Sequence, residues 1–181
     1  MIEAQTLIYQ GRVISLTVDR VRLPNHSSAD LEIIHHPGGA AVVAIDADQR
    51  ICLLYQYRHA ANGWLWELPA GKIDHHEPHL QTAHRELQEE AGCHASTWHY
   101  LGEYISSPGV FTEVVHLYLA SGLERCANQP EEHEVFEVRW LPLQEAITMA
   151  HQGEIRDGKT LVGIFLTQEH LKNTSENTTN P

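Results

Sequence analysis

Residues 83–92 read AHRELQEEAG, and they crowd three carboxylates beside one arginine, Arg85. The carboxylates belong to Glu86, Glu89 and Glu90. Like charges three or four residues apart on a helix repel each other by roughly a few tenths of a kcal/mol even when exposed, and partial burial raises that cost. We therefore expect these acids either to have raised pKa values or to bind a cation.

Apolar residues around this cluster recur at helical spacing. They are Leu80, Ala83, Leu87 and Ala91. The pattern predicts a helix over residues 77–91 that ends at Gly92 and buries this apolar stripe, with the glutamates on the adjoining arc. Most acidic helix faces are simply solvated. Carboxylates that do bind a metal favour Mg²⁺ or Mn²⁺ over zinc.

The composition is that of one globular domain with a small extension: 181 residues, 42% of them hydrophobic. Because 24 acidic residues outnumber 12 scattered basic ones, giving a formal charge of −12, we expect no nucleic-acid partner. The N-terminal residues do not combine a basic segment with an apolar run, and no stretch has the roughly 20 apolar residues of a membrane span. We therefore expect a cytoplasmic protein with no membrane partner.

The chain divides into three parts. Alternating apolar and polar residues predict a small antiparallel sheet over residues 1–38, and the main domain is expected to cover residues 39–171. After the helix described above, the main domain is predicted to contain strands at 97–105, 113–120 and 134–140 and helices at 143–152 and 159–171. The polar end, residues 172–181, is expected to be a disordered tail.

A longer motif surrounds the glutamate cluster. It reads Gly71, five residues, Glu77, seven residues, then Arg85-Glu86-Leu87-x-Glu89-Glu90-x-Gly92, with Cys93 last. This spacing resembles the signature of the Nudix hydrolases at each fixed polar and glycine position. It departs only at Cys93, where the family usually has an aliphatic residue. The resemblance implies an α/β fold, an α/β/α sandwich around a mixed sheet, with the small N-terminal antiparallel sheet added.

The flanking sequence resembles the ADP-ribose pyrophosphatase branch of that family. The similarity includes GRVISLTVDRVRLPN, HPGGAAVVAI and WELPAGKID, and Pro108 stands about fifteen residues after the motif, as in that branch. It implies Mg²⁺-dependent hydrolysis of ADP-ribose, a small nucleotide sugar, to AMP and ribose 5-phosphate. GDP-mannose pyrophosphatases share much of this layout, so GDP-mannose or another nucleoside diphosphate sugar is an alternative substrate. A non-catalytic nucleotide sensor is a third reading.

The resemblance also implies a metal site. Mg²⁺ would be the cofactor, with Mn²⁺ able to replace it, and its ligands would be the carbonyl of Ala70 and the carboxylates of Glu86, Glu89 and Glu90. Glu89 would act in catalysis as well, directly or through water. Arg85 would neutralise and orient the glutamates; as an ordinary exposed helix ion pair it would contribute little.

Further positions are implied for the base, the substrate and the assembly. Glu134, in the loop QPEEHEVFEVRW, is favoured as the base that activates water, with Glu131, Glu132 and Glu113 as alternatives. Substrate contacts are expected at Arg58, Glu67, Glu113 and Tyr9. Arg58 suits a phosphate, although Arg58 and Glu67 equally suit a structural pair, and a tyrosine such as Tyr9 more often packs than stacks on a base. The branch implies a homodimer that exchanges its N-terminal sheets, since this segment is too small to hold its own core.

Overall fold

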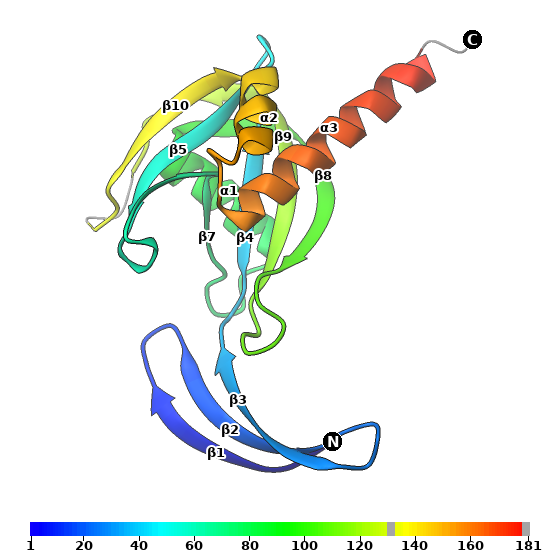
Figure 1. The fold of residues 1–181 in the computed structure, drawn as a ribbon. Coiled ribbons are helices and arrows are strands. Elements are labelled where there is room, and N and C mark those ends of the chain that lie inside the picture. The colour runs from blue at the N-terminus through cyan, green and yellow to red at the C-terminus, as the bar shows by residue number, and fades with distance from the viewer. Residues whose placement is uncertain (130–132, 179–181) are drawn as a thin grey trace.

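The computed structural model describes residues 1–129 and 133–178, which form a small N-terminal sheet and a larger main domain (Figure 1). The strands are β1 (Ile2–Gln10), β2 (Ser15–Arg22), β3 (Ser28–His35), β4 (Gly39–Ala44), β5 (Arg50–Arg58), β6 (Gly63–Glu67), β7 (Ala70–Lys72), β8 (Cys93–Ile105), β9 (Val114–Arg125) and β10 (Phe136–Pro142). The helices are η1 (His59–Ala61), α1 (His79–Ala91), α2 (Leu143–Gln152) and α3 (Gly158–Thr178).

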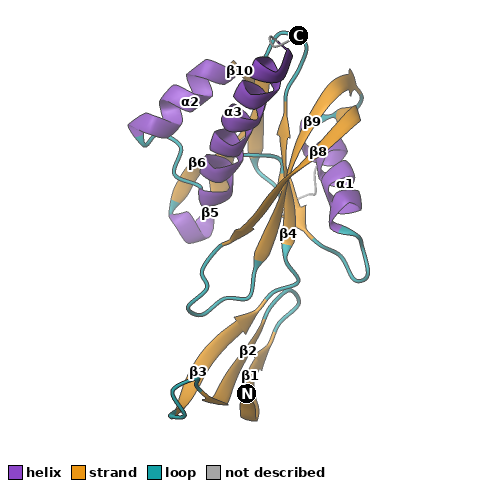
Figure 2. Ribbon diagram, turned by 90° about the vertical axis from the view of Figure 1, so that its right-hand side faces the viewer, coloured by secondary structure: helices purple, strands orange, loops and turns teal. Residues whose placement is uncertain are grey.

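Two sheets form the middle layer of the main domain. One has the strand order β7-β4-β9-β8 and the other β10-β5-β6. Strands β4 and β9 run parallel, and the other neighbours are antiparallel. Helix α1 covers one side of this layer, and α2 and α3 cover the other (Figure 2). The α/β sandwich with a mixed sheet, predicted from the sequence, is confirmed.

Strand β4 explains why helices are needed on both sides. Its six residues are all buried. Ala41 and Val43 face a core shared with α2 and α3, whereas Ala40 and Val42 face a core under α1. A strand that is apolar on both faces is stable only when both faces are covered. Helix α1 is therefore fixed against the sheet beside β7, with which it also packs.

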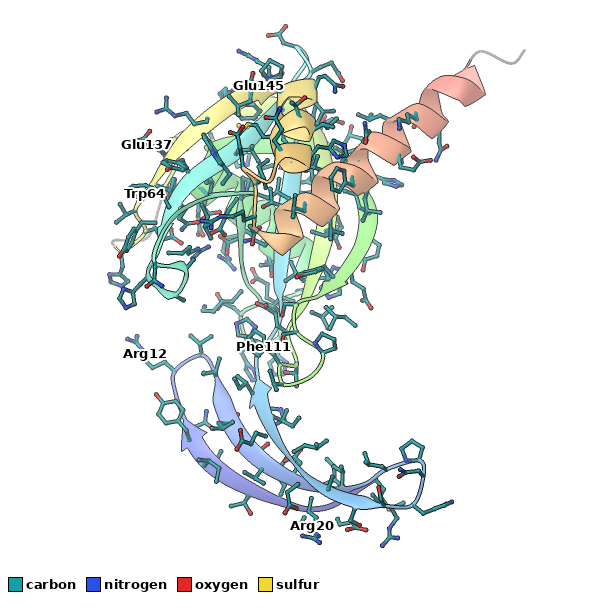
Figure 3. The ribbon with its side chains drawn as sticks, in the orientation of Figure 1. Arg12, Arg20, Trp64, Phe111, Glu137 and Glu145 are labelled. Atoms are coloured by element: carbon teal, nitrogen blue, oxygen red, sulfur yellow. The ribbon has the colours of Figure 1, made fainter. Side chains whose placement is uncertain are left out.

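The N-terminal sheet has the order β1-β2-β3 and projects from the main domain (Figure 1). Ile34 joins the two parts, because its N–H donates to the carbonyl of Val110 at 2.7 Å and its carbonyl accepts from the N–H of Thr112 at 3.0 Å. Phe111 lies at this junction (Figure 3). Every residue of β1 is exposed, so a single chain does not cover this strand.

Helix α1 differs from its prediction in two details. It begins at His79 rather than at residue 77, because Pro78 has an extended backbone with φ −63° and ψ 136°. Leu80, expected in the buried stripe, is 38% exposed, and Thr82 is buried instead. The buried face is thus rotated toward the glutamates, which brings them further into the interior than the sequence indicated.

Helix α3 is longer than predicted. It continues through Thr178, so residues 172–178 are helical rather than part of a disordered tail. The reason is that neither glycine nor proline occurs between Ile164 and Asn180 to end it. Despite the 21 residues of α3, none of the helices in the described part of the chain combines the length and apolar character needed to cross a membrane.

Two glycines that end helices permit a matched test of packing. Gly92 after α1 and Gly153 after α2 both have left-handed backbones, with φ of 60° and 77°. A Cβ at Gly92 would lie 2.9 Å from the carbonyl oxygen of Cys126, whereas one at Gly153 would have no atom within 4 Å. Both alanine variants incur backbone strain of about 1 kcal/mol, and only Gly92→Ala adds a clash.

We therefore expect Gly92→Ala to lower the free energy of unfolding by about 1 kcal/mol more than Gly153→Ala does. Urea denaturation of the two variants measures this difference. Equal losses of unfolding free energy in the two variants would show that the chain after β9 moves away from the added Cβ and does not fix the end of α1.

Candidate active site

A cleft of about 680 Å³ lies where α1, the β5–β6 hairpin and the start of α3 meet. Helix α1 contributes Arg85, Glu86 and Glu89 to its walls, and the hairpin contributes Arg58 and Glu67. The remaining polar lining residues include His36, Lys72, Asp74, Glu113, Glu134, Asp157 and Lys159. Charged side chains of both signs are therefore concentrated in one cavity. Such a concentration is typical of a functional site.

Two glutamates of α1 are largely removed from water. Glu90 is 1% exposed and Glu86 is 6% exposed. Burial raises the pKa of Glu86 to about 7 and raises that of Glu90 well above its ordinary value. The charge of Glu86 raises the pKa of Glu90 further. A helix that buries two carboxylates in this way loses stability unless a positive charge or a proton compensates them.

Only one of the two carboxylate oxygens of Glu90 has a hydrogen-bond partner among the described residues. Its Oε2 accepts a hydrogen bond from the backbone N–H of Ala70 at 2.7 Å. Its Oε1 is buried and has no hydrogen-bond partner within residues 1–129 and 133–178. An unsatisfied buried carboxylate oxygen costs on the order of 1–3 kcal/mol or more. It is therefore the clearest sign that a ligand is needed beside α1.

Gly71 allows β7 to approach Glu86 closely. A Cβ placed on Gly71 would lie 1.8 Å from Glu86 Oε1, so a side chain there would displace the carboxylate of Glu86. The glycine is thus required by a close approach of backbone and carboxylate, rather than by a turn. It lets the carboxylate of Glu86 lie against Gly71, one residue after Ala70, whose N–H donates to Glu90.

Arg85 gathers the acids around its guanidinium group. Its Nη1 donates to Glu86 Oε1 at 2.5 Å and to Glu89 Oε2 at 3.1 Å. Its Nε and Nη2 donate to the two oxygens of Glu77 at 3.2 and 3.1 Å, and Nη2 also donates to the carbonyl of Lys72 at 3.1 Å. One cation therefore orients the cluster, but it reaches only one oxygen of Glu86 and does not contact Glu90.

The cluster fits a divalent cation. In the described part of the chain, no three His, Cys, Asp or Glu side chains converge into a closed set of ligands, and both Glu86 and Glu89 are turned toward Arg85. The unpaired Oε1 of Glu90 and the raised pKa of Glu86 nevertheless show a deficit of positive charge. Oxygen donors with such a deficit suit a hard divalent cation. The predicted ligand set of Ala70, Glu86, Glu89 and Glu90 stays a prediction.

Glu134, the predicted base, lines the same cleft. It is close enough to α1 for its charge to raise the pKa values of both Glu86 and Glu90. The next residue, Val135, accepts a hydrogen bond from the N–H of Tyr57 at 2.9 Å, which ties this loop to β5. The alternatives Glu131 and Glu132 lie outside the described residues.

Arg58 and Glu67 form a bidentate ion pair, which was one of the two alternatives that the sequence allowed for them. Arg58 Nε and Nη2 lie 2.8 and 3.0 Å from the two oxygens of Glu67. Glu67 is 2% exposed, and burial opposes its ionisation, but the hydrogen bonds from Arg58 and the charges of Lys159 and Arg58 outweigh burial and lower its pKa. Lys159 was not singled out from the sequence. The only available signal was the Asp157-x-x-Thr160 pattern of a helix start.

Of the other two predicted substrate contacts, Glu113 lies in the cleft and Tyr9 does not. Glu113 lines the cleft, and its Oε1 lies 3.5 Å from His36 Nδ1. His36 was also not predicted from the sequence, because two adjacent histidines before a proline and two glycines form no specific pattern. Tyr9 lies on β1, is 57% exposed, and is not among the residues that line the cleft. A single chain does not bring it to the site.

The burial of Glu86 predicts a pH-dependent stability in the metal-free protein. Because its pKa rises from 4.5 to about 7 on folding, the folded protein binds more protons than the unfolded chain across this window, and stability falls as pH rises through it. Each pKa unit corresponds to about 1.4 kcal/mol, so at pH 8 the ionised Glu86 costs roughly 3 kcal/mol. Glu86→Gln should therefore unfold at a higher temperature than the unchanged protein at pH 8 in EDTA.

At pH 4 this difference should vanish, because Glu86 is then protonated in both states. Glu169→Gln, a change at an exposed position of α3, is the control and should show little difference at either pH. A Glu86→Gln variant that is less stable than the unchanged protein at pH 8 would contradict this account of the site.

Comparison with known proteins agrees with this geometry. Residues 35–162 match the NUDIX domain family. The chain is 39% identical over 168 residues to the ADP-ribose pyrophosphatase of Mycobacterium tuberculosis (strain ATCC 25618 / H37Rv), covering 91% of this chain and 80% of that protein. It is 38% identical over 169 residues to the methanol dehydrogenase activator of Bacillus methanolicus, covering 91% of each.

A solved structure of an ADP compounds hydrolase has the same fold, with a TM-score of 0.83 over 96% of this chain and 95% of that one, at 20% sequence identity. The family match covers most of the chain and includes α1 with its glutamates. Together with the identity to the relatives above, it shows that this chain belongs to the NUDIX domain family of hydrolases.

Proposed function

We propose that this protein is a Mg²⁺-dependent hydrolase that cleaves the diphosphate of ADP-ribose to AMP and ribose 5-phosphate. The observation that carries the proposal is the unpaired Oε1 of Glu90, in a cluster of carboxylates beside a cleft that also contains Arg58. Such a cleft suits a substrate that is anionic and enters with a cation. The relative from Mycobacterium tuberculosis is named for ADP-ribose, which supports this substrate.

In this proposal the residues of α1 hold the metal ion. Glu86, Glu89 and Glu90, with the carbonyl of Ala70, would be its protein ligands. A bound Mg²⁺ supplies charge neutralisation for diphosphate oxygens and lowers the pKa of water. Arg85 orients Glu86 and Glu89 through the hydrogen bonds described above.

Glu134 would accept the proton of the attacking water. A carboxylate at this place is suited to the role because it faces the cleft without being fully buried. Its charge already acts on Glu86 and Glu90, so a cation held by those residues would lie near Glu134 as well. Proton transfer to a positioned carboxylate typically contributes about 10²–10⁴-fold to a rate.

Tyr9, the predicted contact for the base of the nucleotide, lies outside the cleft of its own chain. We propose that the protein is a homodimer in which the N-terminal sheet of one chain completes the site of the other. In support, β1 and the turn that follows it carry apolar side chains that are 46–58% exposed: Ile2, Leu7, Ile8, Tyr9 and Val13. Such a patch on a small sheet is commonly covered by a partner.

Light scattering at micromolar concentration tests this assembly. A mass of twice that of the 20.5 kDa chain is expected. Replacing Leu7 and Ile8 by serine should yield monomers whose far-ultraviolet circular dichroism is unchanged. A monomeric mass for the unchanged protein would refute the dimer without affecting the chemistry proposed for α1.

The release of AMP from ADP-ribose tests the proposed reaction. Rapid release with Mg²⁺ and none in EDTA is expected, while GDP-mannose at equal concentration is turned over more slowly. Glu90→Gln should abolish turnover, because it replaces a ligand oxygen with an amide, while the protein remains folded. If GDP-mannose is instead the better substrate, the enzyme cleaves another nucleoside diphosphate sugar; if no nucleotide sugar is cleaved, the protein is a sensor.

The role of Glu134 has its own test. We expect Glu134→Gln to lower kcat by about 10²-fold or more and to leave KM for ADP-ribose nearly unchanged, since the base acts only during the reaction. Glu137→Gln is the control, because Glu137 is an exposed residue of β10 (Figure 3). An unchanged kcat in Glu134→Gln would transfer the role to Glu113, Glu131 or Glu132.

A further inference from the structure

The first turn of α3 places an ammonium group in the cleft. Lys159 lines the cleft, and its Nζ lies 2.5 Å from Glu67 Oε2 and 3.0 Å from Asp157 Oδ2. Its side chain is 15% exposed. Lysine side chains usually keep the ammonium group in water. A lysine that is mostly buried between two carboxylates therefore has a fixed position.

Glu67 connects this lysine to Arg58. Glu67 Oε2 is shared between Arg58 Nη2 at 3.0 Å and Lys159 Nζ at 2.5 Å, and Arg58 Nε holds Oε1 at 2.8 Å. One buried carboxylate is thus held by two cations, one on β5 and one on α3. The Nη1 group of Arg58 is not part of this pair, and it has two N–H donors.

The orientation of the Nη1 group depends on Glu67. A bidentate pair fixes the plane of a guanidinium group relative to its carboxylate. The carboxylate in turn is fixed by Lys159, because Oε2 is buried and the ammonium group is its second partner. Without Lys159, a buried carboxylate oxygen would lose a charged hydrogen bond and could rotate, and Arg58 would rotate with it.

We propose that Lys159 is a positioning residue that holds Glu67 so that Arg58 presents its Nη1 group to the diphosphate of the substrate. The identity of the substrate as a nucleotide sugar rests on the proposed function. The binding of a diphosphate by Arg58 does not, because any diphosphate in the cleft would contact the same guanidinium group. The effect of Lys159 passes through Glu67 and Arg58.

The same turn also has a structural role that must be separated from this one. Thr160 Oγ1 accepts the N–H of Leu68 at 2.9 Å and donates to Asp157 Oδ2 at 2.5 Å. The bond from Leu68 ties α3 to the segment that follows β6, and the bond to Asp157 lies within the start of α3. Thr160→Val removes the bond to Leu68 and keeps every charge at Glu67, whereas Lys159→Met removes a charge and keeps the bond between Thr160 and Leu68. Asp157 Oδ2, which both side chains contact, loses one partner in each variant.

The test is a double-mutant cycle on the binding of inorganic pyrophosphate, measured by calorimetry with Mg²⁺ present. Lys159→Met and Arg58→Ala should each weaken binding by about tenfold or more, and the double variant should bind no more weakly than Arg58→Ala alone. Lys159→Arg, which keeps the charge, should recover part of the loss. Lys172→Met, on the same helix but away from this cleft, should bind normally.

For ADP-ribose, Lys159→Met should raise KM by a similar factor and leave kcat within about twofold. Additive losses in the cycle, or a Thr160→Val variant that loses pyrophosphate binding as strongly as Lys159→Met, would show a structural role only. Failure of the unchanged protein to bind pyrophosphate would also overturn the inference. Intact coupling on pyrophosphate without turnover of ADP-ribose would refute the proposed function and leave this inference standing.

Discussion

The arrangement of the cleft depends on the burial of two carboxylates on one helix. Glu86 and Glu90 share the inner face of α1 with Ala83 and Leu87, which pack in the core under β4. The apolar residues hold the helix against the sheet, and this packing keeps the acids out of water. The side-chain-free surface of Gly71 makes room for Glu86. Apolar packing thus maintains a charge arrangement that would be unfavourable in isolation.

The cations of the cleft are placed beside its carboxylates. Arg85 neutralises the exposed edge of the cluster, and within the described residues Glu90 Oε1 has no hydrogen-bond partner. Arg58 and Lys159 instead surround Glu67, so that this carboxylate stays ionised although it is buried. Among the described residues, the site therefore has a carboxylate oxygen without a partner, Glu90 Oε1, and a donor group that the pair with Glu67 does not use, Arg58 Nη1. A metal ion and a diphosphate together complement both.

The sequence predicted the elements of this site better than their surroundings. Helical periodicity and the spacing of the motif from Gly71 to Cys93 were sufficient to identify α1, because both depend on residues close together in the chain. Lys159 could not be found in this way, since its partner Glu67 lies 92 residues earlier. Leu80 and the end of α3 were misjudged, because periodicity alone shows neither which turn contacts the sheet nor how far a polar helix continues. The contribution of Tyr9 depends on a second chain and stays a prediction.

The most direct test of the central claim is the number of protons released when Mg²⁺ binds. Calorimetric titration of the protein with Mg²⁺ at pH 7, repeated in two buffers that differ in ionisation enthalpy, gives this number. Because burial raises the pKa of Glu86 to about 7 and that of Glu90 well above its ordinary value, part of the cluster is protonated before the metal binds. We expect protons to be released on binding, and release to decrease in Glu90→Gln. Binding without proton release, or no binding, would contradict the account of α1 as a buried acidic site that a cation completes.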